Sequence, residues 1–177
     1  MKDRNIIIKN ISDVDPKDFI PFGQIVGLYN EPPLEDFVHL KYYKENIVLG
    51  PSKEGIEEVT VGLLHCKKRI AGEPIIKLER HPKFSETFIP LNGGEVVFIM
   101  APTDNSKSEP DTNRIRAFLL DGKLGVYLHK GTWHWPPLPI REFANIVLIS
   151  KGELFSGTDF VDIGFNVYPI FWIYKFL

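Results

Sequence analysis

Short runs of apolar and β-branched residues dominate the chain, and turn-forming residues separate them. These runs lie at 46–50, 58–66, 74–81, 95–100, 115–120, 124–129, 143–150 and 168–177. Asp-Gly-Lys at 121–123 predicts a hairpin, and Asn-Gly-Gly at 92–94 predicts a second tight turn. Many short strands joined by such turns indicate a mostly-β sandwich or jelly-roll barrel. The middle of such a barrel is a natural site for a small molecule.

Helical patterns are few. A cap residue followed by Pro16 predicts one short helical turn within 12–23, ending before Pro21. Residues 34–43 are ambiguous between helix and other structure, and the polar stretch 101–113 is typical of a surface loop. We find no repeat of solenoid length and no linker between domains, so we expect one domain over residues 1–177.

Composition and charge narrow the range of functions. The formal net charge is −2 and basic residues do not cluster, which argues against nucleic acid as a partner. The apolar end, 167–177, is far shorter than the ~20 residues that span a bilayer, so we expect no membrane segment. We see no targeting segment, and Cys66 is the single cysteine. Both observations favour the cytoplasm, a reducing compartment.

Candidate chemistry lies in two places along the chain. If 75–82 is a strand, Lys77, Glu79 and His81 share one face, which is equally consistent with a solvated face when this strand is taken alone. Glu86 follows His81 by five residues. Later, "HKGTWHWPP" at 129–137 places two histidines around a glycine. The combined spacing is E-x-H-x4-E followed by H-x-G-x2-H.

This spacing resembles the two-part signature of the cupin superfamily. Glu79 and His81 occupy the positions of the first two histidines, Glu86 that of the glutamate and His134 that of the final histidine. The resemblance implies a cupin-type double-stranded β-helix, a jelly-roll barrel with few short helices. It also implies His81, Glu86, His134 and Glu79 as ligands of a divalent first-row metal, Ni²⁺ among the options.

A closer resemblance is to the ureidoglycolate lyases, cupins that release urea from ureidoglycolate. It rests on Glu-Arg-His-Pro at 79–82, Phe-Ile-Pro at 88–90, Arg-Ala-Phe at 116–118 and the glycine, histidine and tryptophan series within 125–136, and it covers most of 19–150. Departures from the family pattern are Glu86 for the common Gln, Tyr127-Leu128 for Asn-Tyr, and Trp135 for a second consecutive His.

These departures leave two other classes of function open. One is another cupin enzyme, such as a metal-dependent sugar isomerase or epimerase. The other is a non-catalytic cupin that binds a small ligand. The resemblance itself implies a lyase that releases urea and glyoxylate by acid/base elimination, and the ligand set leads us to expect metal assistance. Cupins are commonly dimers, and the apolar segment 167–177 agrees with a homodimer.

The implied elimination needs a base for the substrate hydroxyl, an acid for the leaving nitrogen and a cation for the carboxylate. Histidine suits proton transfer near neutral pH, and arginine can hold a carboxylate through two hydrogen bonds. The expected catalytic residues are His129, His134 and Glu86. The expected substrate-binding residues are Arg116, Lys130 and Trp133. Packing remains an alternative for Trp133, as does a surface ion pair for Arg116.

Overall fold

A computed structural model describes residues 2–27, 35–36, 41–42, 59–68, 73–104, 106–151 and 159–170. The strand expected at 46–50 and the last part of the one expected at 168–177 lie outside these residues. Within the ambiguous stretch 34–43, two short strands, β3 (Glu35–Asp36) and β4 (Lys41–Tyr42), pair antiparallel. This part of the stretch is therefore extended.

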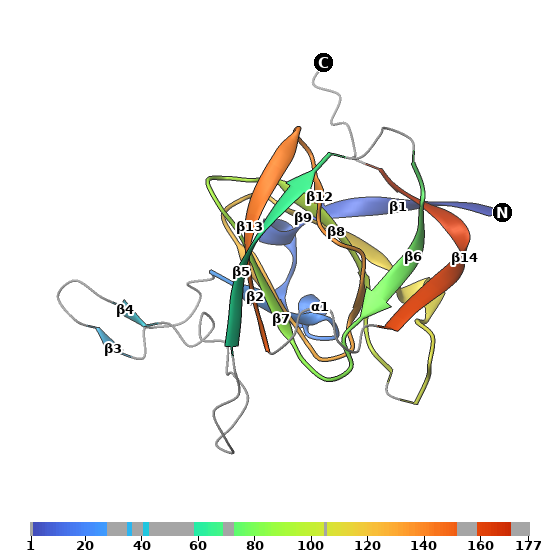
Figure 1. Ribbon diagram of the computed structural model, residues 1–177, viewed down its shortest axis with the longest axis horizontal. Coiled ribbons are helices and arrows are strands. Elements are labelled where there is room, and N and C mark those ends of the chain that lie inside the picture. Colours follow the sequence, from blue (N-terminus) through green and yellow to red (C-terminus); the bar gives the residue numbers. More distant parts are fainter. Residues whose placement is uncertain are drawn as a thin grey trace.

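Most strands of the described chain form two sheets that face each other (Figure 1). The larger sheet has the order β11 (Trp133–His134), β6 (Ile75–Arg80), β14 (Asp159–Ile170), β1 (Lys2–Asn10), β9 (Arg116–Leu120), β8 (Val96–Ala101) and β12 (Leu138–Pro139). The smaller sheet has the order β2 (Gly23–Val26), β10 (Gly125–Leu128), β7 (Glu86–Pro90), β13 (Phe143–Lys151) and β5 (Val59–Lys67). A further pairing of β11 with β8 closes six strands of the larger sheet into a ring.

Helices are short, as expected. The helix α1 (Pro16–Phe19) begins where the Asp15 side chain accepts a hydrogen bond from the Lys17 N–H, and Pro16 fits its first turn. Within the described residues, single 3-10 turns occupy Ile11–Asp13 and Thr112–Arg114. Among the described residues, no helix is both long enough and apolar enough to cross a membrane. The predicted mostly-β, cupin-type jelly roll with few short helices is confirmed.

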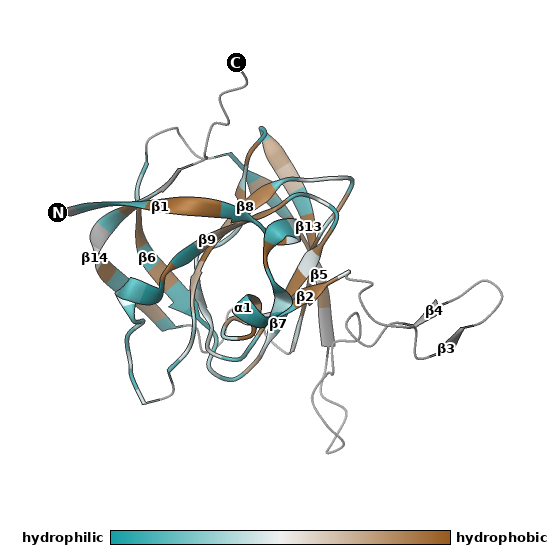
Figure 2. Cartoon of the chain, turned by 180° about the vertical axis from the view of Figure 1, so that it is seen from behind, coloured by the Kyte–Doolittle hydropathy of each residue, from teal (hydrophilic) through white to brown (hydrophobic). Residues whose placement is uncertain are grey.

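Two apolar clusters fill this architecture. One lies between the smaller sheet and the β8–β9 face of the larger sheet and contains Phe88, Phe98 and Phe118. The other receives side chains from all six strands of the closed ring, including Ile99 and Trp133. Successive residues of β8 alternate between the two clusters, as the pleat of a strand requires. Similar alternation of hydrophilic and hydrophobic residues is visible along β6 and β14 (Figure 2).

The hairpin prediction at 121–123 is wrong. Gly122 adopts the expected positive φ of 82°, but β9 before it and β10 after it belong to different sheets. The turn at 92–94 behaves in the same way, since it joins β7 of the smaller sheet to β8 of the larger. Both turns therefore carry the chain across the jelly roll. Local turn chemistry fixes where the chain bends but not which strands pair.

Candidate active site

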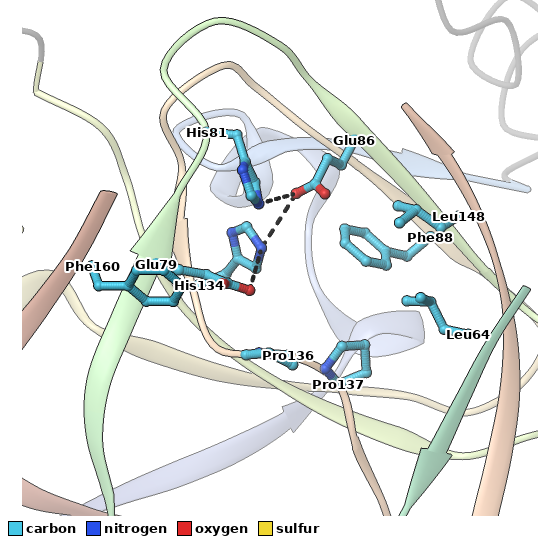
Figure 3. A pocket seen from close by; sticks show the side chains of 10 residues that line it. All are labelled: Leu64, Glu79, His81, Glu86, Phe88, His134, Pro136, Pro137, Leu148 and Phe160. Atoms are coloured by element: carbon cyan, nitrogen blue, oxygen red, sulfur yellow. Dashed lines mark ion pairs between the residues drawn. The ribbon is translucent and has the colours of Figure 1, made fainter. Parts of the chain in front are cut away.

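Four ionisable side chains meet between the two sheets, and they are the four that the spacing selected as metal ligands. Glu79 is the next-to-last residue of β6, His81 directly follows that strand, Glu86 begins β7 and His134 lies on β11. Glu86 Oε2 lies 3.3 Å from His134 Nε2 and 3.5 Å from His81 Nε2. Glu79 Oε1 lies 3.7 Å from His134 Nε2. Figure 3 shows these side chains converging on one another from β6, β7, β11 and the connection that follows β6.

Backbone contacts explain how the distant segment 129–134 reaches His81. Gly131 has a φ of 75°, a left-handed conformation that favours glycine, and its N–H donates to the His81 carbonyl at 2.9 Å. A Cβ at this position would lie 2.9 Å from Thr103 Oγ1, so the bend is also sterically tight. Directly after the bend, His134 pairs with Glu79 across the β11–β6 ladder. The bend at Gly131 thus delivers His134 to the cluster.

Contacts around the imidazole rings fix their orientation. His134 Nδ1 lies 3.0 Å from the Thr132 carbonyl oxygen. A carbonyl can only accept, so Nδ1 carries the hydrogen and Nε2 presents its lone pair to the two glutamates in the neutral ring. The His81 ring stacks on Phe84, with ring centroids 4.7 Å apart and an interplanar angle of 18°. Both rings are therefore held with a nitrogen toward the centre of the cluster.

Burial changes the proton affinities of the cluster. Burial, with a smaller contribution from the charge of Glu79, raises the pKa of Glu86 to about 8. Burial lowers the pKa of His134 to about 4, although the hydrogen bond to Thr132 opposes this change. Burial also raises the pKa of Glu79 and lowers that of His81. In the metal-free site at neutral pH, neutral imidazoles therefore face a Glu86 carboxyl that is still largely protonated.

The donor set suits a divalent metal. Glu79, His81 and His134 each offer one ligand atom, and these atoms lie within 4.8 Å of one another. Two ligand atoms about 2.1 Å from one tetrahedral ion lie roughly 3.4 Å apart, so small adjustments would bring these atoms to a shared ion. The Nδ1–H of His134 bonded to a backbone carbonyl is the usual outer contact of a metal-binding histidine.

A pocket of about 430 Å³ opens over the cluster. The remaining described residues of its lining are apolar: Leu64, Phe88, Pro136, Pro137, Leu148 and Phe160. Figure 3 shows Leu64, Phe88 and Leu148 across the pocket from the histidines. Neither lysine nor arginine occurs among the described lining residues.

Four residues expected to take part in catalysis or substrate binding do not line this pocket. His129 is exposed, and its Nε2 lies 3.1 Å from the Ile20 carbonyl oxygen. Lys130 is also exposed. Arg116 Nη1 donates to the carbonyls of Asn113 and Ile115 at the outer surface. Their placement gives no support to the roles expected for them.

Trp133 is the fourth of these residues. It is buried in the cluster inside the six-stranded ring, where the Arg80 guanidinium lies 4.5 Å from its ring centroid. Arg80 also forms an ion pair with Asp159, its Nε 2.9 Å from a carboxylate oxygen. Trp133 and His134 are adjacent on β11 and point to opposite faces of the strand. Trp133 therefore packs in the core, which is the alternative left open for it by the sequence.

Sequence reasoning missed several residues of the pocket wall. Leu64 and Leu148 occupy inward positions of strands whose pattern predicted burial but gave no sign of a pocket. Phe160 was not expected in a strand, because the strand predicted at 168–177 in fact begins at Asp159. Pro137 lay in the quoted motif without an assigned role. A pocket wall and a core position share the same alternation, so the sequence carried no signal that separates them.

Comparison with known proteins finds relatives in sequence and neighbours among solved structures. Curated ureidoglycolate lyases from Salmonella paratyphi B and Salmonella typhimurium are each 28% identical over 153 residues, covering 85% of this chain and 89% of the relative. Among solved structures, RmlC from Streptococcus suis in complex with dTDP-D-xylose aligns with a TM-score of 0.42 and 9% identity, over 54% of this chain and 45% of that chain. The dTDP-4-dehydrorhamnose 3,5-epimerase from Elizabethkingia anophelis aligns with a TM-score of 0.39 and 13% identity, over 56% and 53%.

The resemblance found in the sequence motifs extends over nearly the whole chain. The profile of the family described as Ureidoglycolate lyase matches residues 6–165, from within β1 to within β14. All four clustered residues lie inside this range. This protein therefore belongs to the ureidoglycolate lyase family.

Proposed function

We propose that this protein is a lyase that cleaves ureidoglycolate to urea and glyoxylate in the pocket between its sheets. Family membership supports the reaction, and the meeting of Glu79, His81, Glu86 and His134 supports the place. The observation that carries the proposal is the buried Glu86 carboxyl, within 3.5 Å of two imidazoles at the base of a pocket.

The reaction needs two proton movements at neighbouring atoms. The substrate carbon bears a hydroxyl, a carboxylate and a ureido nitrogen. Loss of the hydroxyl proton forms the carbonyl of glyoxylate, and a proton gained by the nitrogen completes urea as the C–N bond breaks. Because burial raises the pKa of Glu86 to about 8, this carboxyl can exchange a proton near neutral pH. Since Glu86 is largely protonated at neutral pH, we assign it to give its proton to the leaving nitrogen and to take up the hydroxyl proton, which restores its starting state.

Charge balance in the pocket favours a metal cofactor. Ureidoglycolate is an anion, and the described lining contains two carboxyl groups but no lysine or arginine. We propose that Glu79, His81 and His134 hold a divalent cation such as Ni²⁺, which leaves Glu86 for proton transfer. When bound, such a cation would supply Lewis-acid polarisation of substrate oxygens and offset the negative charge.

A glyoxylate-release assay on purified variants tests these roles. Glu86→Gln keeps the shape of the side chain but removes the exchangeable proton, so kcat should fall by roughly 10²–10⁴-fold. His134→Ala should abolish turnover and leave the protein folded, as circular dichroism can check. His65→Ala is the matched control because this exposed histidine lies on β5 and pairs with Asn145 away from the pocket. Unchanged turnover in His134→Ala would refute the assignment.

Metal content is tested separately. Elemental analysis of the purified protein should find a divalent first-row metal, and chelation should remove both metal and activity. Added Ni²⁺ should restore urea release from ureidoglycolate in the wild type but not in His134→Ala. Full activity after complete removal of metal would overturn the metal assignment while leaving the lyase assignment intact.

We also propose that the protein acts in the cytoplasm as a homodimer of single-domain subunits. The apolar composition of 167–177 supports self-association, and the single Cys66 supports a reducing compartment. Light scattering should give twice the monomer mass, and cell fractionation should recover the protein in the cytosol. A monomer over the working concentration range would contradict the dimer.

A further inference from the structure

The pocket has two chemically different sides. Among the described lining residues, the four ionisable side chains, Glu79, His81, Glu86 and His134, gather on one side. The facing wall is built by Leu64 from β5, Phe88 from β7 and Leu148 from β13, with Pro136 and Pro137 below the histidines in the view of Figure 3. None of these five wall side chains has a hydrogen-bond donor or acceptor.

This asymmetry fixes the direction in which a ureido acid can lie. Proton transfer requires the reacting carbon, with its hydroxyl and carboxylate, to approach Glu86 and its neighbours. The ureido group must then extend away from them, toward Leu64 and Leu148. In ureidoglycolate that arm ends in an NH₂ group, whose hydrogens would meet apolar side chains. A polar group that loses water without gaining a partner weakens binding.

The size of the pocket points the same way. A volume of about 430 Å³ falls in the range of sites that bind drug-sized ligands. Ureidoglycolate is much smaller than such a ligand, so space remains beyond its terminal nitrogen. Phe88 and Leu148 are almost fully buried, at 3% and 5% exposed, so this part of the wall is built into the core of the fold.

We propose that the preferred substrates are ureidoglycolates whose distal nitrogen carries an apolar substituent, such as a butyl group. This proposal rests on the lyase function proposed above and names the substrate class of the same site. The hydroxyl proton leaves its oxygen, the C–N bond breaks as the carbonyl forms, and the leaving nitrogen gains a proton. The products are glyoxylate and an N-alkylurea, and no oxidant or further reactant is needed.

Glyoxylate release from two substrates on the metal-loaded wild type tests this preference. We expect kcat/KM for the distal N-butyl derivative to exceed that for ureidoglycolate by about tenfold or more, since each buried methylene contributes to discrimination. Equal or lower kcat/KM for the butyl derivative would overturn the inference while leaving the lyase function in place. Release of glyoxylate from neither compound would overturn the proposed function itself.

A pair of variants on one strand tests the wall. Leu64→Ser introduces a hydroxyl into the pocket lining, whereas Leu63→Ser alters the preceding residue of β5, which is 63% exposed on the other face. Leu64→Ser should lower the butyl preference about tenfold. Leu63→Ser should retain it. Equal preferences in the two variants, both folded by circular dichroism, would overturn the role of the wall.

Product inhibition of the wild type tests the apolar wall without any variant. In the wild type acting on ureidoglycolate, N-butylurea should inhibit at a concentration about tenfold lower than urea does, because its alkyl chain can occupy the apolar side. If the two ureas inhibit equally, the apolar wall contributes nothing to binding and the inference fails. This comparison tests the role of the apolar wall even if Leu64→Ser does not fold.

Discussion

Glu86 combines a titratable group with a nearly water-free environment. Its side chain is buried, two imidazole nitrogens lie within 3.5 Å of it, and Glu79 adds a nearby negative charge. Burial and that charge both disfavour the carboxylate, and the pKa of Glu86 rises from an ordinary value of 4.5 to about 8. The folded protein therefore holds a proton that the unfolded chain has already released at neutral pH.

This difference makes the stability of the metal-free protein depend on pH. Between 4.5 and 8 the folded state binds the Glu86 proton and the unfolded state does not, so the free energy of unfolding falls as pH rises. The loss should be on the order of 1 kcal/mol per pH unit where it is steepest. In Glu86→Gln this loss should be absent. Urea denaturation of chelator-treated wild type and variant at several pH values measures the difference between them.

His134 contributes with the opposite sign. Its pKa falls from 6.5 to about 4 in the folded state, so its contribution to stability is complete above 6.5 and is lost as the pH falls toward 4. Glu86→Gln keeps His134, and the difference between the two proteins therefore isolates Glu86. A difference that stays constant from pH 5 to 8 would show that the Glu86 carboxyl is not perturbed in the folded protein.

At the scale of single residues, the motif spacing predicted the cluster because family resemblance and strand alternation pointed to the same four residues. It misplaced Trp133, although alternation alone separates this residue from His134, since neighbours on a strand cannot both face one pocket. The positions of His129 and Arg116 depend on contacts with the backbone and not on strand alternation. His129 contacts the carbonyl of the distant Ile20, and Arg116 donates to the carbonyls of Asn113 and Ile115 just before it in the chain. Such backbone contacts have no periodic signature in the sequence.

At the scale of elements, the turn at Asp121–Lys123 shows the limit of local signals. The Asp121 side chain accepts from the Lys123 N–H, and Gly122 takes the positive φ that the sequence indicated. The following strand nevertheless crosses to the other sheet, because its apolar residues Val126 and Leu128 complete the core between the sheets. Pairing over such distances depends on the summed burial of many strands, which a window of a few residues does not contain.

The two crossing turns touch each other, and this contact makes a prediction. A Cβ on Gly122 would lie 2.5 Å from the backbone of Gly93, whereas a Cβ on Gly93 would meet nothing within 4 Å. Both glycines have positive φ, of 82° and 69°. Gly93→Ala should therefore cost about 1–2 kcal/mol for its backbone conformation alone. Gly122→Ala should cost more, since a backbone neighbour cannot rotate away.

Urea denaturation at one pH compares the two alanine variants directly. Gly93→Ala serves as the control for the left-handed conformation, so the excess in Gly122→Ala reports the contact between the turns. Equal losses of stability in the two variants would mean that the turns are not packed as described. Such a result would also question how the two sheets are joined at this end.

At the scale of the whole molecule, the candidate metal ligands and Glu86 belong to different sheets. Glu79 and His134 lie on β6 and β11 of the larger sheet, while Glu86 begins β7 of the smaller one. His81 sits just after β6, in the connection between the two sheets. The site therefore exists only once both sheets have assembled, and the unfolded chain cannot reproduce it. A ligand of this site should stabilise the fold as a whole.

This dependence predicts that a divalent metal raises the thermal stability of the protein. With free Ni²⁺ at a hundred times its dissociation constant, binding to the folded state alone adds about 2.7 kcal/mol. For a chain of this length, that corresponds to an increase in Tm of roughly 5–10 °C. Scanning calorimetry with and without Ni²⁺ should show this increase in the wild type and in His65→Ala, and His134→Ala should lose most of it. Equal increases in His65→Ala and His134→Ala would place the metal elsewhere, because His134 is a ligand only in the site between the sheets.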